Sequence, residues 1–316
     1  MKRSLDNNFI KDLKSLETGK LNNLLKRIKK DSTLDLQFRG DSVDVYYRGG
    51  KVLNLKKNTD SYTAKIDKNY FKDEIIDFKA DDIQDWIDKL PLIKQARDFH
   101  YTENKNTAER EFQQLIIRTN NYERTSNSSD IFITDMEYDF NVGTSDKKKG
   151  QIDLIGIEWS TNQRSKNGLN TKLAFIEVKF GNGAVSGKSG LEDHLNDIKE
   201  YLTSYKKDYE NLRDDTLKVF QQKRELELYS FGKGGNDNQI TKIDEKPYFI
   251  ILLADYKNKE NNLYDLIEKV DLRNYEEHFD LRFSVASFMG YGLYSDSLLT
   301  KNQILEHITS ISNVKN

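Results

Sequence analysis

Three strand-like segments of this chain are too continuously apolar to have one face in water. They are QIDLIGIEW at 151–159, KLAFIEVKF at 172–180 and PYFIILLADY at 247–256. Strands that are apolar on both faces occur in sheets that helices cover on each side. The sequence therefore predicts an α/β fold with a mixed central sheet flanked by helices, to which 281–293 adds a further strand.

The stretches around these strands complete the α/β order. Helices are predicted at 107–120 and 190–205, where apolar residues recur every three or four positions. Residues 130–140 are predicted to form another strand, and the polar stretch 159–171 a hairpin loop.

The N-terminal part has a different pattern, which indicates a smaller α+β module. Apolar residues in 8–30 recur at helical spacing, with a break near Thr18-Gly19. Alternating strands with glycine turns follow, typical of an antiparallel meander. The expected strands are 34–39, 43–48, 51–56 and 61–66. The acidic segment 71–90 is predicted to be a helix that ends before Pro91.

Length and pattern together predict two domains in this chain of 316 residues. Residues 1–90 are assigned to the N-terminal module, with a specificity, partner-binding or regulatory role. Residues 91–316 are assigned to the larger α/β domain, and the linker is placed at about 91–106.

Composition excludes several classes of protein. Cysteine is absent, which excludes disulfides, thiolate nucleophiles and the usual structural zinc sites. No apolar run approaches the roughly 20 residues that cross a bilayer, and the first residues lack a signal-peptide pattern, so a cytoplasmic protein without a membrane partner is expected. The net charge of −2 argues against a protein that coats nucleic acid, although Lys and Arg are in excess within 1–60.

Charged residues at the ends of two apolar strands are the main chemical signal. Glu177 and Lys179 fall on one face of 172–180, where unpaired charges would be costly to bury. A structural Glu–Lys pair explains that strand equally well. Asp153, however, interrupts the apolar run at the start of 151–159, and antiparallel pairing of the two strands would bring it beside Glu177 and Lys179.

Two neighbouring carboxylates repel each other unless a cation lies between them. Carboxylate and carbonyl oxygens are hard ligands, which favours Mg²⁺ or Mn²⁺. The expected ligands are Asp153, Glu177 and the carbonyl of Val178.

This pattern of Asp153, a hairpin and Glu177-Val178-Lys179 resembles the signature of the PD-(D/E)XK nuclease superfamily. Ile152 stands where many members have proline. The preceding stretch TAEREFQQLIIRTN resembles the opening helix of archaeal Holliday-junction resolvases, which implies Glu109 as a further metal-binding and catalytic acid, with Glu111 as the alternative. The resemblance implies a restriction-endonuclease-like sheet and a Mg²⁺- or Mn²⁺-dependent phosphodiesterase in which Lys179 orients or deprotonates the attacking water.

The helix after the signature is a candidate for substrate contacts. His194, Asp197 and Tyr201 recur at spacings of three and four and can line one stripe of a helix. His194 is the candidate for a phosphate or metal-water contact, and Lys188 in the preceding glycine-rich loop for a phosphate clamp. Gln151 and Tyr201 complete the candidate substrate contacts, while a helix-edge histidine without catalytic duty remains an equal interpretation for His194.

The favoured function is a DNA endonuclease of bacterial restriction or phage defence, acting as a homodimer or with a defence-system partner protein. Its substrate class rests on the resemblance alone. A repair or recombination nuclease, and a nuclease-fold protein without catalysis that binds nucleic acid or protein, are the alternatives. A third interpretation makes the β module at 34–66 the binding element and the remainder a scaffold.

Overall fold

The computed structural model describes residues 2–71, 77–103, 108–122, 124–143, 149–164, 166, 168–180, 190–230, 240–254, 263–286, 293, 295 and 298–313. The helices are α1 (Asn7–Lys14), α2 (Asn22–Lys29), α3 (Ile83–Glu103), α4 (Ala108–Asn121), α5 (Leu191–Ser204), α6 (Lys206–Glu225), α7 (Leu263–Glu268) and α8 (Lys301–Asn313). The strands are β1 (Leu34–Phe38), β2 (Ser42–Tyr47), β3 (Gly50–Lys57), β4 (Tyr62–Lys65), β5 (Ile131–Asn141), β6 (Lys149–Glu158), β7 (Leu169–Thr171), β8 (Leu173–Phe180), β9 (Ile240–Ile243), β10 (Tyr248–Ala254) and β11 (Asp280–Ala286).

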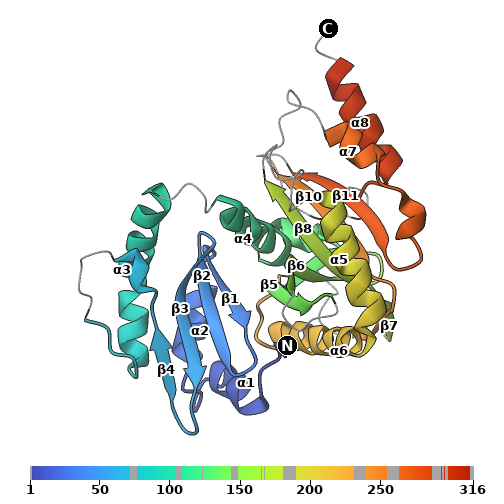
Figure 1. Cartoon of the computed structure of the whole chain (residues 1–316). Coiled ribbons are helices and arrows are strands. Elements are labelled where there is room, and N and C mark those ends of the chain that lie inside the picture. The colour runs from blue at the N-terminus through green and yellow to red at the C-terminus, as the bar shows by residue number, and fades with distance from the viewer. Residues whose placement is uncertain are drawn as a thin grey trace.

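The predicted N-terminal meander is confirmed. Strands β1 to β4 form a four-stranded antiparallel sheet in chain order, and α1 and α2 are separate helices as the break near Thr18-Gly19 predicted. One face of the sheet packs on α1, α2 and α3 in a shared apolar core. In Figure 1 this sheet lies beside the larger one, with α4 between their upper parts.

The predicted mixed α/β sheet is also confirmed. Its strand order is β11-β10-β8-β6-β5, in which β5, β6 and β8 are antiparallel and β8, β10 and β11 are parallel. Residues 287–292 of the expected last strand lie outside the described residues. The expected hairpin loop contains β7, which pairs with β9 in a separate parallel pair.

Helices cover both faces of the mixed sheet, which explains the apolar strands. On one face α5 and α6 pack on the side chains of a large core that includes Phe175 and Phe249. On the other face α4 packs on Ile176 and Ile250 through its own Ile116. No helix within the described part of the chain combines the length and apolarity that a membrane span requires.

The predicted helix end before Pro91 is wrong. Helix α3 begins at Ile83 rather than at 71 and continues through Pro91. Its buried side chains pack into the core of the meander, which holds the helix together across the residue that lacks an N–H donor; they include Trp86, Leu90 and Ile93. Helix α3 therefore crosses the expected boundary between 1–90 and 91–316. The division of the chain into these two domains stays a prediction.

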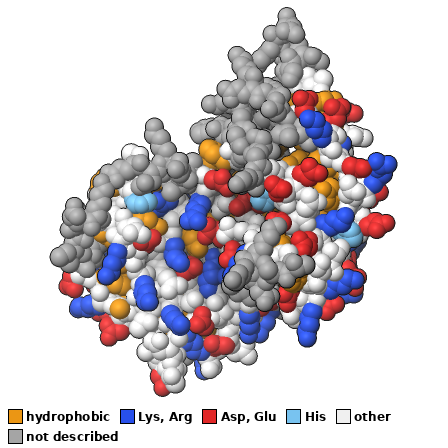
Figure 2. Space-filling view, in the orientation of Figure 1, with side chains coloured by type: hydrophobic (Ala, Val, Ile, Leu, Met, Phe, Trp, Pro, Cys, Tyr) orange, Lys and Arg blue, Asp and Glu red, His pale blue; other side chains and the backbone are white. Residues whose placement is uncertain are grey.

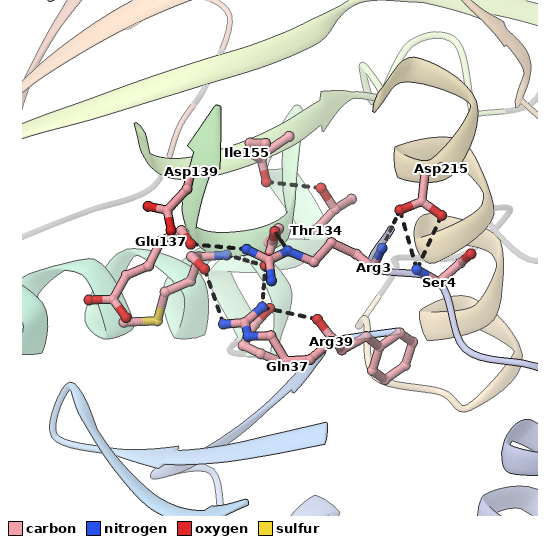
Figure 3. A network of polar contacts seen from close by, with 12 residues as sticks. Arg3, Ser4, Gln37, Arg39, Thr134, Glu137, Asp139, Ile155 and Asp215 are labelled. Carbon is pink, nitrogen blue, oxygen red and sulfur yellow. Dashed lines mark hydrogen bonds and ion pairs between the residues drawn. The ribbon is translucent and has the colours of Figure 1, made fainter. Parts of the chain in front are cut away.

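A buried polar network joins the residues before α1 to the mixed sheet (Figure 3). Arg3 Nε donates to Asp135 Oδ2 at 2.7 Å, and Arg39 Nη1 donates to Asp135 Oδ1 at 2.6 Å. The backbone N–H groups of Arg3 and Ser4 donate to the carboxylate of Asp215 on α6. Shared ion pairs and hydrogen bonds therefore link the N-terminal segment to β5, to α6 and to the turn that follows β1.

Candidate functional site

The antiparallel pairing of β6 and β8 brings the predicted site residues together. The register pairs Leu154 with Ile176, so Asp153 and Glu177 follow at the next position. Glu177 and Lys179 share a face of β8, while Val178 lies on the opposite face with the core around α4. The expected meeting of one strand's start with the other strand's end is therefore confirmed.

Glu177 and Lys179 are buried because β10 lies directly beside β8. Their parallel-strand neighbours are the apolar residues Ile251 and Leu253, and each of the two charged residues is only 5% exposed. Lys179 Nζ donates to Glu177 Oε1 at 2.8 Å, which pairs the two charges. A buried pair of this kind still requires further partners for its remaining polar atoms.

His194 on α5 supplies one of these partners. Its Nε2 atom lies 2.9 Å from Lys179 Nζ and 3.2 Å from Glu177 Oε1. Since an ammonium group only donates, the ring nitrogen accepts from Lys179 in this arrangement. His194, predicted as a phosphate or metal-water contact, thus lies beside Glu177 and Lys179, and its contact with phosphate or water stays a prediction.

Asp153 is held by α4 and by the backbone of β8. Gln113 Nε2 donates to Asp153 Oδ1 at 2.8 Å, and the Val178 N–H donates to Asp153 Oδ2 at 2.7 Å. Gln113 was not among the predicted residues. Its spacing of four from Glu109 was the available signal, because that spacing places both side chains on one helix face.

Burial raises the pKa values of all three carboxyl groups. Burial raises the pKa of Asp153 well above its usual value, and the charges of Glu177 and Glu109 raise it further. Burial also raises the pKa of Glu177 against the opposing effect of Lys179. The pKa of Glu109 is raised by burial and by Glu177, while Lys179 lowers it. Glu109 therefore belongs electrostatically to the same site.

Glu111 points to another part of the molecule. Its carboxylate binds Arg48 of the N-terminal module, with Arg48 Nε 2.7 Å from Glu111 Oε1. Because residues two positions apart on a helix face different directions, α4 presents Glu109 to the site and Glu111 to the meander. This geometry favours Glu109 as the helix acid.

Two of the remaining predicted contacts, Gln151 and Tyr201, are not gathered at the site. Gln151 is exposed, and its amide donates to Asp139 Oδ1 on β5 at 3.1 Å. Tyr201 is 1% exposed and packs against Phe140 and Phe175, so it belongs to the core instead of lining the site. Lys188 lies outside the described residues.

The side chains present fit a hard divalent cation, although the described residues contain no ready-made cluster of three His, Asp or Glu ligands. Glu177 Oε2 and Gln113 Oε1 are both buried and have no hydrogen-bond partner among the described residues. Unsatisfied buried oxygen acceptors are rare, and both residues adjoin Asp153, whose pKa is raised by burial and by the charge of Glu177. A cation bound by carboxylate oxygens would satisfy the free oxygen and remove the repulsion.

Comparisons with known proteins found no family model, no curated protein and no solved structure that matches this chain.

Proposed function

We propose that this chain is a PD-(D/E)XK-type nuclease that hydrolyses phosphodiester bonds in DNA with Mg²⁺ or Mn²⁺. The observation that carries the proposal is the buried group of Asp153, Glu177 and Lys179 at the adjoining ends of two central strands, where no described residue partners Glu177 Oε2. A mixed sheet flanked by helices, with the signature on β6 and β8, agrees with a restriction-endonuclease-like fold.

Asp153 and Glu177 would hold the cation, with Glu109 as a further ligand and the Val178 carbonyl beside them. The bound cation would polarise the phosphate and lower the pKa of a water molecule. Lys179 would position that water and neutralise the charge that develops on the phosphate oxygens. His194, through its contact with Lys179 Nζ, would orient the ammonium group.

The charge distribution of the N-terminal module supports a nucleic acid as substrate. The open face of β3 and β4 carries the exposed side chains of Lys51, Lys56 and Lys65, and Figure 2 shows Lys and Arg side chains spread over this part of the molecule. Lysines that face a phosphate backbone contribute affinity without sequence preference. The preference for DNA and a role in restriction or phage defence rest on the resemblance.

One observation favours the alternative of a nuclease-fold binding module without catalysis. Both oxygens of Asp153 already accept hydrogen bonds, from Gln113 and from the Val178 N–H. A protein that never binds a cation would be stabilised by such contacts. Metal binding therefore separates the two proposals.

The test is cleavage of plasmid, single-stranded and branched DNA and of RNA with Mg²⁺, Mn²⁺ or EDTA. We expect metal-dependent cleavage of DNA that falls by at least about 100-fold in Asp153→Asn, Glu177→Gln and Lys179→Ala. Asp193→Asn, which alters an exposed acid beside His194, is the matched control and should cleave normally. Preference for branched DNA would indicate a repair nuclease. Absence of both cleavage and Mn²⁺ binding in a folded protein would overturn the proposal.

A further inference from the structure

The turn between β2 and β3 packs directly against the first two turns of α4. Tyr47 and Gly50 are paired, so Arg48 and Gly49 form a two-residue turn with φ values of 46° and 66°. Positive φ at both positions is what the preferred hairpin turns require. A Cβ atom at Gly49 would overlap the backbone of Arg110, so only glycine permits this close approach.

Side chains of α4 bind the turn through several specific contacts. Arg48 forms a two-pronged ion pair with Glu111, with Nε–Oε1 at 2.7 Å and Nη2–Oε2 at 3.4 Å. The Gly49 N–H donates to Gln114 Oε1 at 2.6 Å. The amide of Gln114 in turn donates to the carbonyl oxygens of Thr33 and Tyr46. The direction of α4 is thereby fixed relative to the meander.

The same two turns of α4 serve the candidate metal site on another side of the helix. Gln113 binds Asp153, and Glu109 interacts electrostatically with Asp153 and Glu177. Glu109 and Gln113 are four residues apart, whereas Glu111 and Gln114 face the turn. The first two turns of α4 thus contact the N-terminal module on one side and the candidate metal site on the other.

We infer that the β2–β3 turn, through the Arg48–Glu111 pair, positions Glu109 for metal binding, so that Arg48 is a positioning residue of the site in the other module. The inference rests on the proposed metal-dependent function. It gives the N-terminal module a structural part in the site, in addition to any contact with substrate.

The surroundings of Arg48 indicate that the pair directs the helix more than it stabilises the fold. The side chains of Arg48 and Glu111 are 31% and 22% exposed, and an open cavity of about 350 Å³ lies beside them. Ion pairs with this exposure contribute little to stability because water screens them. Arg48 Nη1 also pairs with Asp98 on α3 at 2.9 Å, and the Asp98 side chain is 40% exposed. Removing the guanidinium should therefore leave two solvated carboxylates and an intact fold.

The experiment measures the Kd for Mn²⁺ by calorimetry in metal-free protein. Arg48→Ala should weaken binding about tenfold, as loss of an outer-sphere positioning group does, with a melting temperature within about 3 °C of wild type. Arg48→Lys keeps the positive charge and loses the forked guanidinium group. Its Kd for Mn²⁺ should lie between those of the wild-type protein and Arg48→Ala. Arg27→Ala, which breaks a similarly exposed arginine pair with Asp31 inside the N-terminal module, is the matched control and should bind normally.

A double-mutant cycle separates positioning of Glu109 from a general effect. In a Glu109→Ala background, Arg48→Ala should change the Kd no further, because the group that Arg48 positions is already absent. An equal loss in both backgrounds, or an unchanged Kd for Arg48→Ala alone, would overturn the inference while the nuclease proposal stands. Failure of the wild-type protein to bind Mn²⁺ would instead count against the proposed function.

Discussion

Asp153 is the residue at which the proposed site conflicts most with stability. Its carboxyl group is buried near Glu177 and Glu109, and all three pKa values are raised. An acid whose pKa is higher in the folded state binds protons more readily when folded, so the free energy of unfolding falls as the pH rises from the unfolded pKa, near 4, through the folded pKa. Without a metal, the ionised site therefore opposes folding at neutral pH.

Replacing Asp153 should accordingly stabilise the metal-free protein. We expect Asp153→Asn in EDTA to raise the free energy of unfolding at pH 8, because it removes a buried charge whose pKa burial and the charge of Glu177 raise. The asparagine oxygen can still accept from the Val178 N–H, and Gln113 Oε1, which has no partner among the described residues, can accept from its amide. Urea unfolding between pH 4 and 8 measures this, and the difference should vanish near pH 4.

The matched control is Asp139→Asn, a partly buried acid on the neighbouring strand β5. It should show no comparable gain at pH 8. Added Mn²⁺ should stabilise the wild-type protein more than Asp153→Asn, because a ligand stabilises only the state that binds it. Loss of stability in Asp153→Asn at pH 8 would show that the carboxylate is a net structural contact.

At the scale of the element, α3 shows how packing overrides a local helix-ending signal. Proline within a helix removes one hydrogen bond and crowds the carbonyl four residues earlier, at a cost of about 3 kcal/mol. The burial of Trp86, Leu90 and Ile93 in the meander core offsets that cost, because each fully buried large apolar side chain contributes about 1.5 to 3 kcal/mol. Pro91 itself is exposed and takes no part in this packing.

Pro91→Ala should therefore stabilise the protein by about 1 to 2 kcal/mol. The restored backbone hydrogen bond is partly offset by the greater freedom of the unfolded chain. The midpoint of urea unfolding measures the change. Leu92→Ala, at the exposed neighbouring position, is the control and should not raise it. A lower unfolding midpoint for Pro91→Ala would mean that the proline ring makes a favourable contact in the folded protein.

At the scale of the whole molecule, the N-terminal module and the mixed sheet depend on a common buried network. Asp135 on β5 accepts from both Arg3 and Arg39, and its side chain is 6% exposed. Val219 on α6 and Leu226 directly after it also belong to the core of the N-terminal module. These contacts are what a single cooperative folding unit requires, whatever function each part has.

Asp135→Ala should destabilise the whole chain by about 3 to 5 kcal/mol, because the buried guanidinium group of Arg3 would lose its carboxylate partner and that of Arg39 would keep only Asp44. Thermal unfolding followed by far-UV and near-UV circular dichroism should remain a single transition at a lower temperature. Lys29→Ala breaks the solvent-accessible ion pair between α2 and Glu227, which follows α6. It should lower the free energy of unfolding by less than about 1 kcal/mol. Two separate transitions in the wild-type protein would contradict this description.

Much of the fold could be predicted because its signals are local. The alternation of apolar residues located the meander, and the continuously apolar strands located the centre of the mixed sheet. Helix α6 was missed although Tyr209, Leu212, Val219 and Phe220 recur at helical spacing in a highly charged segment. Gln113 was missed because an uncharged amide on a predicted helix gives no chemical signal by itself, and its contact with Asp153 depends on how α4 packs beside β6.

That Asp153, Glu177 and Lys179 would meet could be inferred from local signals, because strand periodicity and antiparallel pairing depend on the chain near each residue. The preference for Glu109 over Glu111 emerged from the folded chain, because it depends on Arg48, a partner far along the chain. The tertiary structure also placed Tyr201 in the aromatic core instead of the site. Helical periodicity defines which residues share a face, but the direction of that face is set by long-range packing that no local pattern contains.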